Sequence, residues 1–237
     1  MTLKALAALS WTSTYCSHAK YFLKADDDAF VNEFAAIKHL QDIQSAGYRR
    51  RLLMCRVWYR PPVARRGKWA VSAAEFAGQQ YPSYCSGLGY IVTGDVVTLL
   101  LNAACQHHQT HHDDVTRNSA EYNFTAGRLF WIDDVYITGI LLQVVGGQIT
   151  HTDISAAYCK SDKMAVIYRH VTEWYKYLFT HVGNDKTHLY MATWNALKQR
   201  SANTTIPSPS LITPGHLADH YMPLSELLQL VKNSHDK

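Results

Sequence analysis

The chain has 237 residues, of which 47% are hydrophobic and 18% charged, and its formal net charge at pH 7 is +4. This length and composition can supply a buried core and exclude an intrinsically disordered chain. The positive charge is too sparse for a nucleic-acid-binding surface, and no run of about 18 apolar residues is available to span a membrane, so we expect neither function from these residues.

Apolar spacing in the first sixty residues predicts alternating helices and strands. Apolar residues recur at helical spacing over residues 2–15, and again from Asn32, a good N-cap residue, through residue 46. Short apolar runs at 20–25 and 52–57 favour strands. The first of these runs ends at three adjacent acidic residues, so we expect a buried strand that carries carboxylates at its tip.

A second set of elements is expected after a loop rich in proline, glycine and aromatic residues. Residues 90–93 favour a strand and 95–105 a helix, whose positive end is next to Asp95. The stretch 106–127 is polar and rich in histidine. Imidazole and carboxylate groups suit a transition metal, but the spacing matches no known motif, so a surface insertion is favoured. The potential ligands in this insertion are His107, His108, His111, His112, Asp113 and Asp114.

Two acidic clusters are the candidate chemical sites. The triplet Asp26 to Asp28 places like charges side by side, and a hard divalent cation with oxygen ligands would compensate them. Asp133 and Asp134 follow an apolar run at the start of a predicted helix, where such a pair suits a general base. The residues alone also fit a solvated turn for the triplet and a favourable helix-dipole interaction for the pair, and both alternatives stay open.

Cysteines and glycosylation sequons favour an oxidising compartment. There are five cysteines, an odd number that leaves one without a disulfide partner, and Asn123 and Asn203 each begin a glycosylation acceptor sequence. The N-terminal residues do not have the pattern of a signal peptide, which by itself favours the cytosol. Together these features predict a secretory protein that has lost its N-terminal part.

Four blocks of sequence, in order along the chain, resemble the beta-1,3-galactosyltransferase-like glycosyltransferases. The first block, residues 20–32, contains the acidic triplet and resembles the metal-binding signature of that family. Residues 68–72, 81–90 and 133–139 resemble its later blocks. Four blocks in the family's order are more specific than an acidic triplet alone. The resemblance predicts a catalytic domain over residues 1–185 and a divergent C-terminal tail over 186–237.

The family resemblance implies both a fold and a reaction. The fold is α/β, a partial type A glycosyltransferase (GT-A, Rossmann-like) domain whose N-terminal strands are missing. The reaction is metal-dependent and inverting: galactose or an N-acetylhexosamine moves from a UDP-sugar to the 3-hydroxyl of an acceptor glycan on a glycoprotein or glycolipid. The implied cofactor is Mn²⁺ or Mg²⁺. The implied location is the lumenal side of the Golgi membrane, with an N-terminal anchor expected in the full-length protein and absent here.

The resemblance also assigns roles to individual residues. Asp28 and Asp26 would hold the metal on the UDP pyrophosphate, and Asp134 would take the proton of the acceptor hydroxyl. A histidine often completes the metal shell in the family. Tyr168 falls near that position in this chain, and His170, two residues further on, is the residue we assign to it. The residues expected to shape or line the donor and acceptor pockets are Asp27, Trp69, Tyr84, Gly87, Gly89 and Asp133. A catalytically inactive fragment or lectin-like relative is the alternative to an active enzyme, and core packing is the alternative for Trp69.

Overall fold

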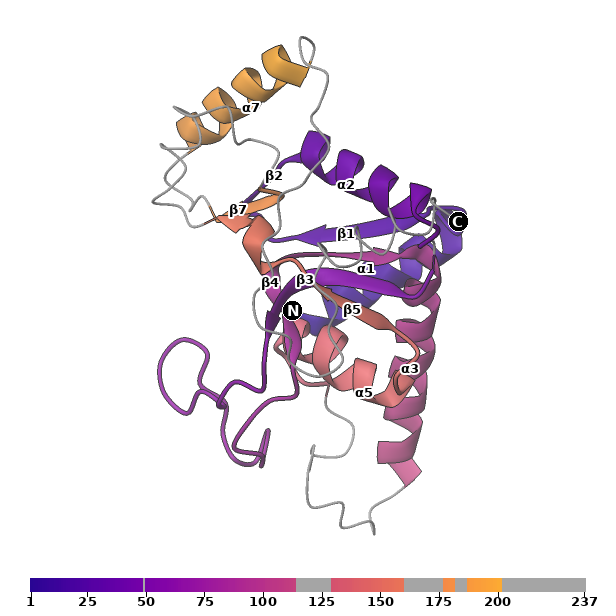
Figure 1. Cartoon of the computed structure of the whole chain (residues 1–237). Coiled ribbons are helices and arrows are strands. Elements are labelled where there is room, and N and C mark those ends of the chain that lie inside the picture. The colour runs from indigo at the N-terminus through magenta and orange to yellow at the C-terminus, as the bar shows by residue number, and fades with distance from the viewer. Residues whose placement is uncertain (49, 114–128, 160–176, 182–186, 202–237) are drawn as a thin grey trace. The chain divides into compact units, whose positions relative to one another are not determined.

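The structure, a computed structural model, describes residues 1–48, 50–113, 129–159, 177–181 and 187–201. Helices and strands alternate along these residues, which confirms the predicted mixed α/β class (Figure 1). The chain divides into two compact units. The first comprises Met1–Phe22, Val57–Gly87 and Val92–Ile149, and the second comprises Leu23–Arg56, Leu88–Ile91 and Thr150–Lys237.

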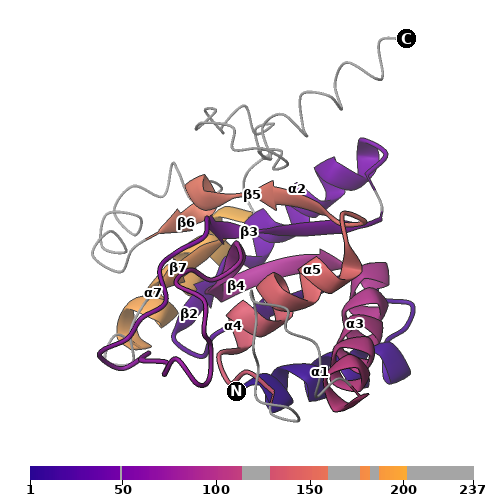
Figure 2. The same cartoon turned by 90° about the horizontal axis from the view of Figure 1, so that it is seen from below.

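A helical core forms the first unit. Buried apolar side chains from three helices pack together, among them Leu9, Leu100 and Leu141, each no more than 1% exposed. Figure 2 shows α1, α3 and α5 close to one another. The helical elements of this unit are α1 (Thr2–Tyr15), α3 (Gly94–Asp113), α4 (Asp133–Val135), the π-helical turn η1 (Tyr136–Ile140) and α5 (Leu141–Val145).

The strands form two sheets. A four-stranded sheet has the order β1-β4-β3-β5, and a three-stranded sheet has the order β2-β7-β6. In the smaller sheet β2 pairs antiparallel with β7, and β6 pairs parallel with β7. The strands are β1 (Tyr21–Ala25), β2 (Ala29–Val31), β3 (Leu52–Trp58), β4 (Tyr84–Thr93), β5 (Thr150–Asp153), β6 (Tyr158–Cys159) and β7 (Phe179–His181).

The strand before the acidic triplet is present but is not buried. β1 lies at one end of the sheet order, so among the described residues it has a single strand neighbour in that sheet. Its residues are only partly buried, and Leu23 is 38% exposed. The expectation of a buried strand was therefore wrong, because the apolar run Tyr21 to Leu23 forms an edge strand and not a central one.

Two helix boundaries follow the local signals in the sequence. α2 (Glu33–Ser45) begins after Asn32, whose side-chain Oδ1 accepts a 3.2 Å hydrogen bond from the Ala35 N–H, as an N-cap should. α5 ends at Gly146, whose φ of +63° lies in the left-handed region that glycine adopts without strain. The predicted N-cap at Asn32 is confirmed.

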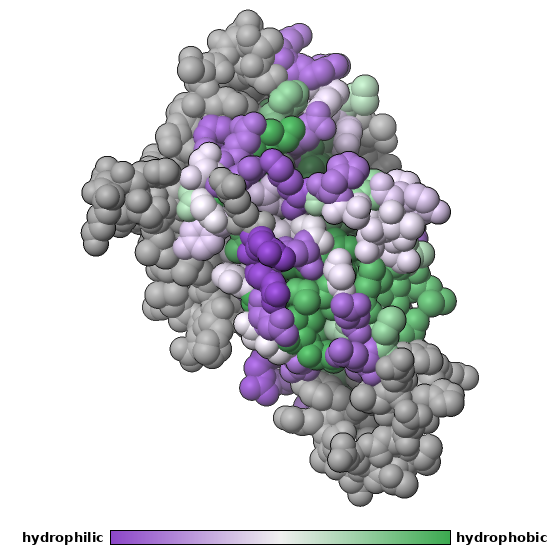
Figure 3. Space-filling model, turned by 90° about the vertical axis from the view of Figure 1, so that its right-hand side faces the viewer, coloured by the Kyte–Doolittle hydropathy of each residue, from purple (hydrophilic) through white to green (hydrophobic). Residues whose placement is uncertain are grey.

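Two further expectations need correction. α3 continues to Asp113, so residues 106–113 of the expected surface insertion are helical, and residues 114–128 lie outside the described part of the chain. On α1, Leu9 is buried as expected but Leu3 is 71% exposed. Figure 3 shows apolar residues (green) beside hydrophilic ones (purple) on one face of the molecule, which is ordinary for a protein surface.

α7 (Thr187–Ser201) falls within the segment expected to be a divergent tail. Within the second unit it packs on the residues that follow the acidic triplet. Tyr190 meets the Phe30 ring edge-on at a centroid distance of 4.8 Å, and Trp194 stacks on Phe34 at 5.4 Å. Aromatic pairs at these separations contribute roughly 0.5–1.5 kcal/mol beyond their burial. None of the helices in the described residues is long and apolar enough to cross a bilayer.

The Asn32 cap generates a stability prediction. Asn32→Ala leaves the first-turn N–H groups of α2 without this acceptor, and we expect the free energy of unfolding to fall by about 1 kcal/mol. Urea denaturation followed by circular dichroism measures this change. Asn102→Ala, the same substitution at an exposed position of α3, is the matched control and should change stability by no more than about 0.5 kcal/mol. Equal losses in the two variants would contradict the capping role.

Candidate functional site

The acidic triplet forms a tight turn between β1 and β2. The Asp26 carbonyl accepts a 3.1 Å hydrogen bond from the Ala29 N–H, and the Asp26 N–H donates to the Leu88 carbonyl at 3.2 Å. Asp26 and Asp27 are exposed, whereas Asp28 is half-buried. The three carboxylates therefore do not share one environment. Asp28 is the one that the fold partly withdraws from water.

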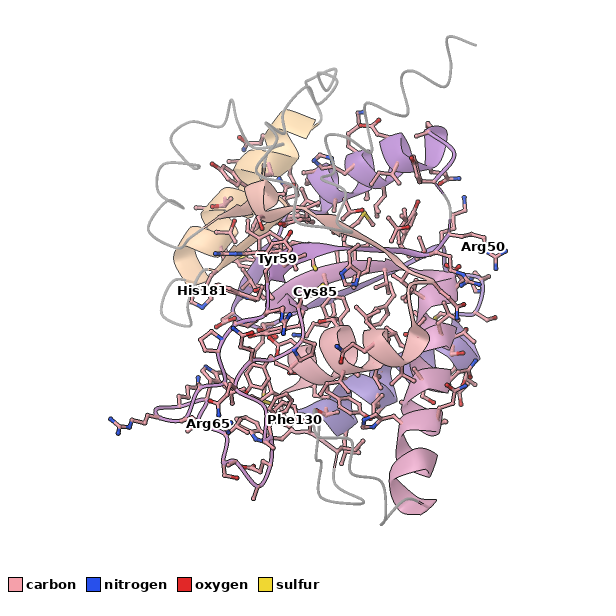
Figure 4. All side chains as sticks on the ribbon, turned by 60° about the horizontal axis from the view of Figure 1, so that its bottom comes forward. Arg50, Tyr59, Arg65, Cys85, Phe130 and His181 are labelled. Carbon is pink, nitrogen blue, oxygen red and sulfur yellow. The ribbon has the colours of Figure 1, made fainter. Side chains whose placement is uncertain are left out.

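Asp28 lies beside a histidine from the far end of the described sequence. Its Oδ2 is 3.1 Å from Nε2 of His181. The strand register explains this contact, because antiparallel pairing of β2 with β7 sets His181 opposite Ala29, the residue after Asp28. His181 is labelled at the end of β7 in Figure 4 and is half exposed, so the pair is open to solvent.

The other members of the predicted metal site behave differently. Asp26 forms a salt bridge with Lys24 on β1. His170, the predicted third ligand, lies outside the described residues. Sequence reasoning did not select His181. Its only local signal is a histidine after two residues that favour a strand, and nothing local connects it to a carboxylate 153 positions away.

The Asp28–His181 pair fits part of a divalent metal site. In the part of the chain that the structure describes, no three His, Cys, Asp or Glu side chains are grouped so that they could hold a metal ion. A carboxylate oxygen and an imidazole nitrogen at 3.1 Å nevertheless form a donor set that Mn²⁺ accepts. Cations bound with nucleotides commonly use one or two protein ligands and complete their shell with phosphate oxygens and water. The pair is thus compatible with a cation shared with a diphosphate.

Asp134 is held by the backbone on both of its oxygens. Its Oδ2 accepts a 3.1 Å hydrogen bond from the Gly87 N–H on β4, and its Oδ1 accepts one of 2.9 Å from the Val135 N–H. A Cβ atom at position 87 would lie 3.0 Å from Oδ2, so glycine permits this close approach. Each carboxylate oxygen has two lone pairs, so the carboxylate is oriented and still has acceptor capacity left for a substrate proton.

Buried polar contacts attach the helix of Asp134 to β4. The Thr138 hydroxyl donates to the Asp134 carbonyl at 2.6 Å and accepts from the Cys85 N–H at 2.9 Å. Thr138 is fully buried, and its single hydroxyl satisfies two backbone groups, of which the Cys85 N–H is buried. Thr138 lies in the π-helical turn η1, a form of helix often found at functional sites.

Tyrosines surround this corner of the first unit. Burial raises the pKa of Tyr81 to about 12, and the charge of Asp134 contributes in the same direction. Burial, together with the nearby Asp134 charge, also raises the pKa of Tyr84. Both phenols are therefore neutral at physiological pH. The buried Tyr81 hydroxyl has no hydrogen-bond partner in the part of the chain that the structure describes, so it remains available as a donor.

The remaining predicted pocket residues have distinct surroundings. Gly89 permits close packing within the second unit, since a Cβ there would lie 2.3 Å from the Phe179 ring. The Gly89 carbonyl also accepts a hydrogen bond from the Tyr158 hydroxyl. Trp69 is 43% exposed, which argues against core packing, and Asp133 is the first residue of α4. The predicted glycosylation positions Asn123 and Asn203 lie outside the described residues.

The cysteines are divided between bonded and free forms. Cys55 and Cys85 are both disulfide-bonded, whereas Cys16 and Cys105 are free thiols. Structural disulfides persist in oxidising compartments and are rare in the cytosol.

Comparison with known proteins identifies the family. The family model described as galactosyltransferase matches residues 1–123, which is more than half of the chain. The chain belongs to the galactosyltransferase family. The match includes the acidic triplet and the predicted pocket block at 81–90, and it ends before Asp133.

Individual relatives in the galactosyltransferase family agree with this assignment. Human beta-1,3-galactosyltransferase 1 is 36% identical over 116 residues, covering 48% of this chain and 35% of that protein. Human lactosylceramide 1,3-N-acetyl-beta-D-glucosaminyltransferase is 33% identical over 105 residues, covering 44% of this chain and 28% of that protein. Mouse beta-1,3-galactosyltransferase 2 is 31% identical over 122 residues. The chain thus spans about a third of the length of the curated relatives it matches.

The Thr138 bridge generates a second prediction. Thr138→Val removes the hydroxyl and leaves the Cys85 N–H buried without its acceptor, so we expect a loss of roughly 1–3 kcal/mol in the free energy of unfolding. Denaturant unfolding monitored by circular dichroism measures the loss. Thr14→Val is the matched control, because Thr14 also donates to the carbonyl four residues earlier but is exposed on α1. A Thr138→Val protein as stable as the control would refute the bridging role.

Proposed function

We propose that this chain acts as a beta-1,3-glycosyltransferase that moves galactose, or an N-acetylhexosamine, from a UDP-sugar to an acceptor glycan on a glycoprotein or glycolipid. The observation that carries the proposal is the Asp28–His181 pair, at the acidic turn of a member of the galactosyltransferase family. The relatives, two beta-1,3-galactosyltransferases and a 1,3-N-acetyl-beta-D-glucosaminyltransferase by name, support this reaction class.

We propose Mn²⁺, or Mg²⁺, as the cofactor, held by Asp28 and His181. When bound, the cation would supply Lewis-acid stabilisation of the negative charge that develops on the leaving diphosphate. The half-buried Asp28 is the stronger anchor of the triplet, since Asp26 is already paired with Lys24. Displacement of Lys24 would let Asp26 contribute on the donor side, while the exposed Asp27 remains a candidate for donor binding.

Asp134 is proposed to act as the general base. An inverting displacement requires a base to accept the acceptor's hydroxyl proton. The amides of Gly87 and Val135 orient the Asp134 carboxylate without using all of its lone pairs. Thr138 is a positioning residue, because it bonds the Asp134 carbonyl and ties that backbone to β4. Asp133, at the start of the same helix, is proposed to shape the site.

We also propose that the protein works at the lumenal side of the Golgi membrane, held there by an anchor. The disulfide-bonded Cys55 and Cys85 and the sequons at Asn123 and Asn203 support an oxidising, glycosylating compartment.

A metal-binding experiment tests the proposed cofactor site. In the presence of UDP, titration with Mn²⁺ monitored by electron paramagnetic resonance should give saturable binding. His181→Ala should weaken Mn²⁺ binding by more than roughly 10-fold. Loss of a residue that only supports a metal ligand already weakens metal binding by about that factor, and His181 is proposed to be a ligand itself. UDP-galactose hydrolysis with Mn²⁺ should fall in parallel.

His18→Ala is the matched control for this experiment, since His18 is an exposed histidine in the first unit. It should leave Mn²⁺ affinity and hydrolysis unchanged. Donor hydrolysis that survives both Asp28→Ala and His181→Ala would count against the metal site. Absence of hydrolysis by the unmodified chain would favour the inactive or lectin-like alternative.

The general base generates a separate prediction. Asp134→Asn keeps an oxygen for one amide but cannot accept a proton, so the rate of transfer to an acceptor should fall by about 10²- to 10⁴-fold. The measurement is the transfer of radiolabelled galactose to a disaccharide acceptor. Mn²⁺–UDP affinity of the variant, measured as above, serves as the control for folding. Transfer within threefold of the unmodified rate would exclude Asp134 as the base.

A further inference from the structure

Two tryptophans, the exposed Trp69 and the half-buried Trp131, lie face to face in the first unit. The rings of Trp69, in the loop between β3 and β4, and Trp131, just before α4, are stacked with centroids 5.9 Å apart and an interplanar angle of 17°. Trp69 is 43% exposed. A large aromatic side chain usually contributes to a core, so an ordered pair at the surface indicates a binding role. We refer to Trp69 and Trp131 as the tryptophan pair.

Polar contacts hold the tryptophan pair in place. The Trp131 side chain donates a hydrogen bond to the Glu75 carboxylate, which also accepts bonds from the Ser72 hydroxyl and N–H. The Ser72 bonds lower the pKa of Glu75 most, and the Trp131 bond lowers it to a smaller extent. The Arg65 guanidinium donates to the carbonyls of three loop residues, Val71, Phe76 and Gly78. Figure 4 shows Arg65 on this loop with Phe130 near it. The loop is therefore fixed by bonds, and its rings are presented at low entropic cost to a ligand.

Two cations precede Trp69 in the same loop. The Lys68 ammonium lies 5.0 Å from the centre of the Trp69 ring, a cation–π contact. Arg66 and Lys68 are exposed and have no ion pair within the described ranges. They stand on either side of Gly67, whose φ of +85° forms the tip of the turn. Between residues 65 and 75 there are three cationic side chains and one carboxylate, so the loop is locally positive.

We propose that the tryptophan pair and the two loop cations, Arg66 and Lys68, form a subsite for an anionic acceptor glycan, with a sugar ring against the indoles and a sulfate or carboxylate paired with the cations. This inference rests on the proposed function, because it specifies the acceptor of that reaction. The C–H groups of a pyranose ring are attracted to the electron-rich face of an indole, and cations beside it select for negative charge.

Calorimetric titration of three oligosaccharides into the unmodified chain tests the subsite without a donor or turnover. The probes are N-acetyllactosamine, its 6-O-sulfated form and its sialylated form. We expect both anionic probes to bind about 5- to 10-fold more tightly than the neutral one, the range that one or two exposed ion pairs provide. That preference should shrink as salt is raised, because exposed charges are screened. Preference for one anionic form alone would support the subsite and identify its anion.

Single substitutions separate the two parts of the subsite. Lys68→Gln should reduce the preference for anionic probes to about twofold, and Trp131→Ala should weaken all three probes by roughly 5- to 10-fold. Trp131→Phe keeps an aromatic ring but loses the bond to Glu75, and it should weaken binding of the probes less than Trp131→Ala does. It provides a second test if the alanine variant does not fold. Lys4→Gln and Trp11→Ala, at exposed positions of α1, are the matched controls and should bind as the unmodified chain does.

Two results would overturn the proposal. One is equal affinity of the unmodified chain for neutral and anionic probes. The other is an unchanged affinity after Trp131→Ala and Trp69→Ala. UDP-galactose hydrolysis, assayed in parallel, keeps this inference distinct from the proposed function. Hydrolysis without anionic preference would reject the subsite alone, whereas anionic preference without hydrolysis would reject the transferase and retain the subsite.

Discussion

The packing of Phe179 on Gly89 is the contact on which the second unit depends. Phe179 is fully buried at the start of β7, the central strand of the smaller sheet, and its ring occupies the space that a side chain at position 89 would need. The Tyr158 ring lies 5.1 Å from it, and the Tyr158 hydroxyl bonds the Gly89 carbonyl. Phe179 is paired with Val31 in the register of β7 on β2, and the same register places His181, the last residue of β7, opposite Ala29. His181 therefore lies next to Asp28.

In the first unit, hydrogen bonds hold Asp134 in position, whereas strand register positions His181 in the second unit. Its carboxylate accepts from two amides, and Thr138 bonds both the Asp134 carbonyl and the Cys85 N–H. Gly139 lets the same helix approach β4, since a Cβ there would be 3.1 Å from that of Tyr84. Because these hydrogen bonds join the start of α4 to β4, the two elements have little freedom to move separately. A general base needs to be held in position in this way.

Local signals in the sequence predicted much of the secondary structure. Asn32 begins a helix because its side chain satisfies a first-turn amide, and Gly146 ends one because it adopts a left-handed φ. The predictions failed where a distant partner decides burial. The apolar run before the triplet became an edge strand, and α3 extended through histidines that were expected to form a surface loop. The extent of a helix and the order of strands, unlike capping, depend on the neighbours that an element acquires.

By itself the sequence determined the α/β class, the family, and the residue types available for the chemistry: an acidic turn, a later acidic pair and aromatic blocks between them. Only the tertiary structure decided which of these residues meet. It paired Asp28 with a histidine 153 positions away, gave Asp134 its amide donors, and stacked Trp69 on Trp131. The physical reason is that caps and turns are satisfied within a few residues, whereas these contacts require long-range strand pairing and packing that no local pattern encodes.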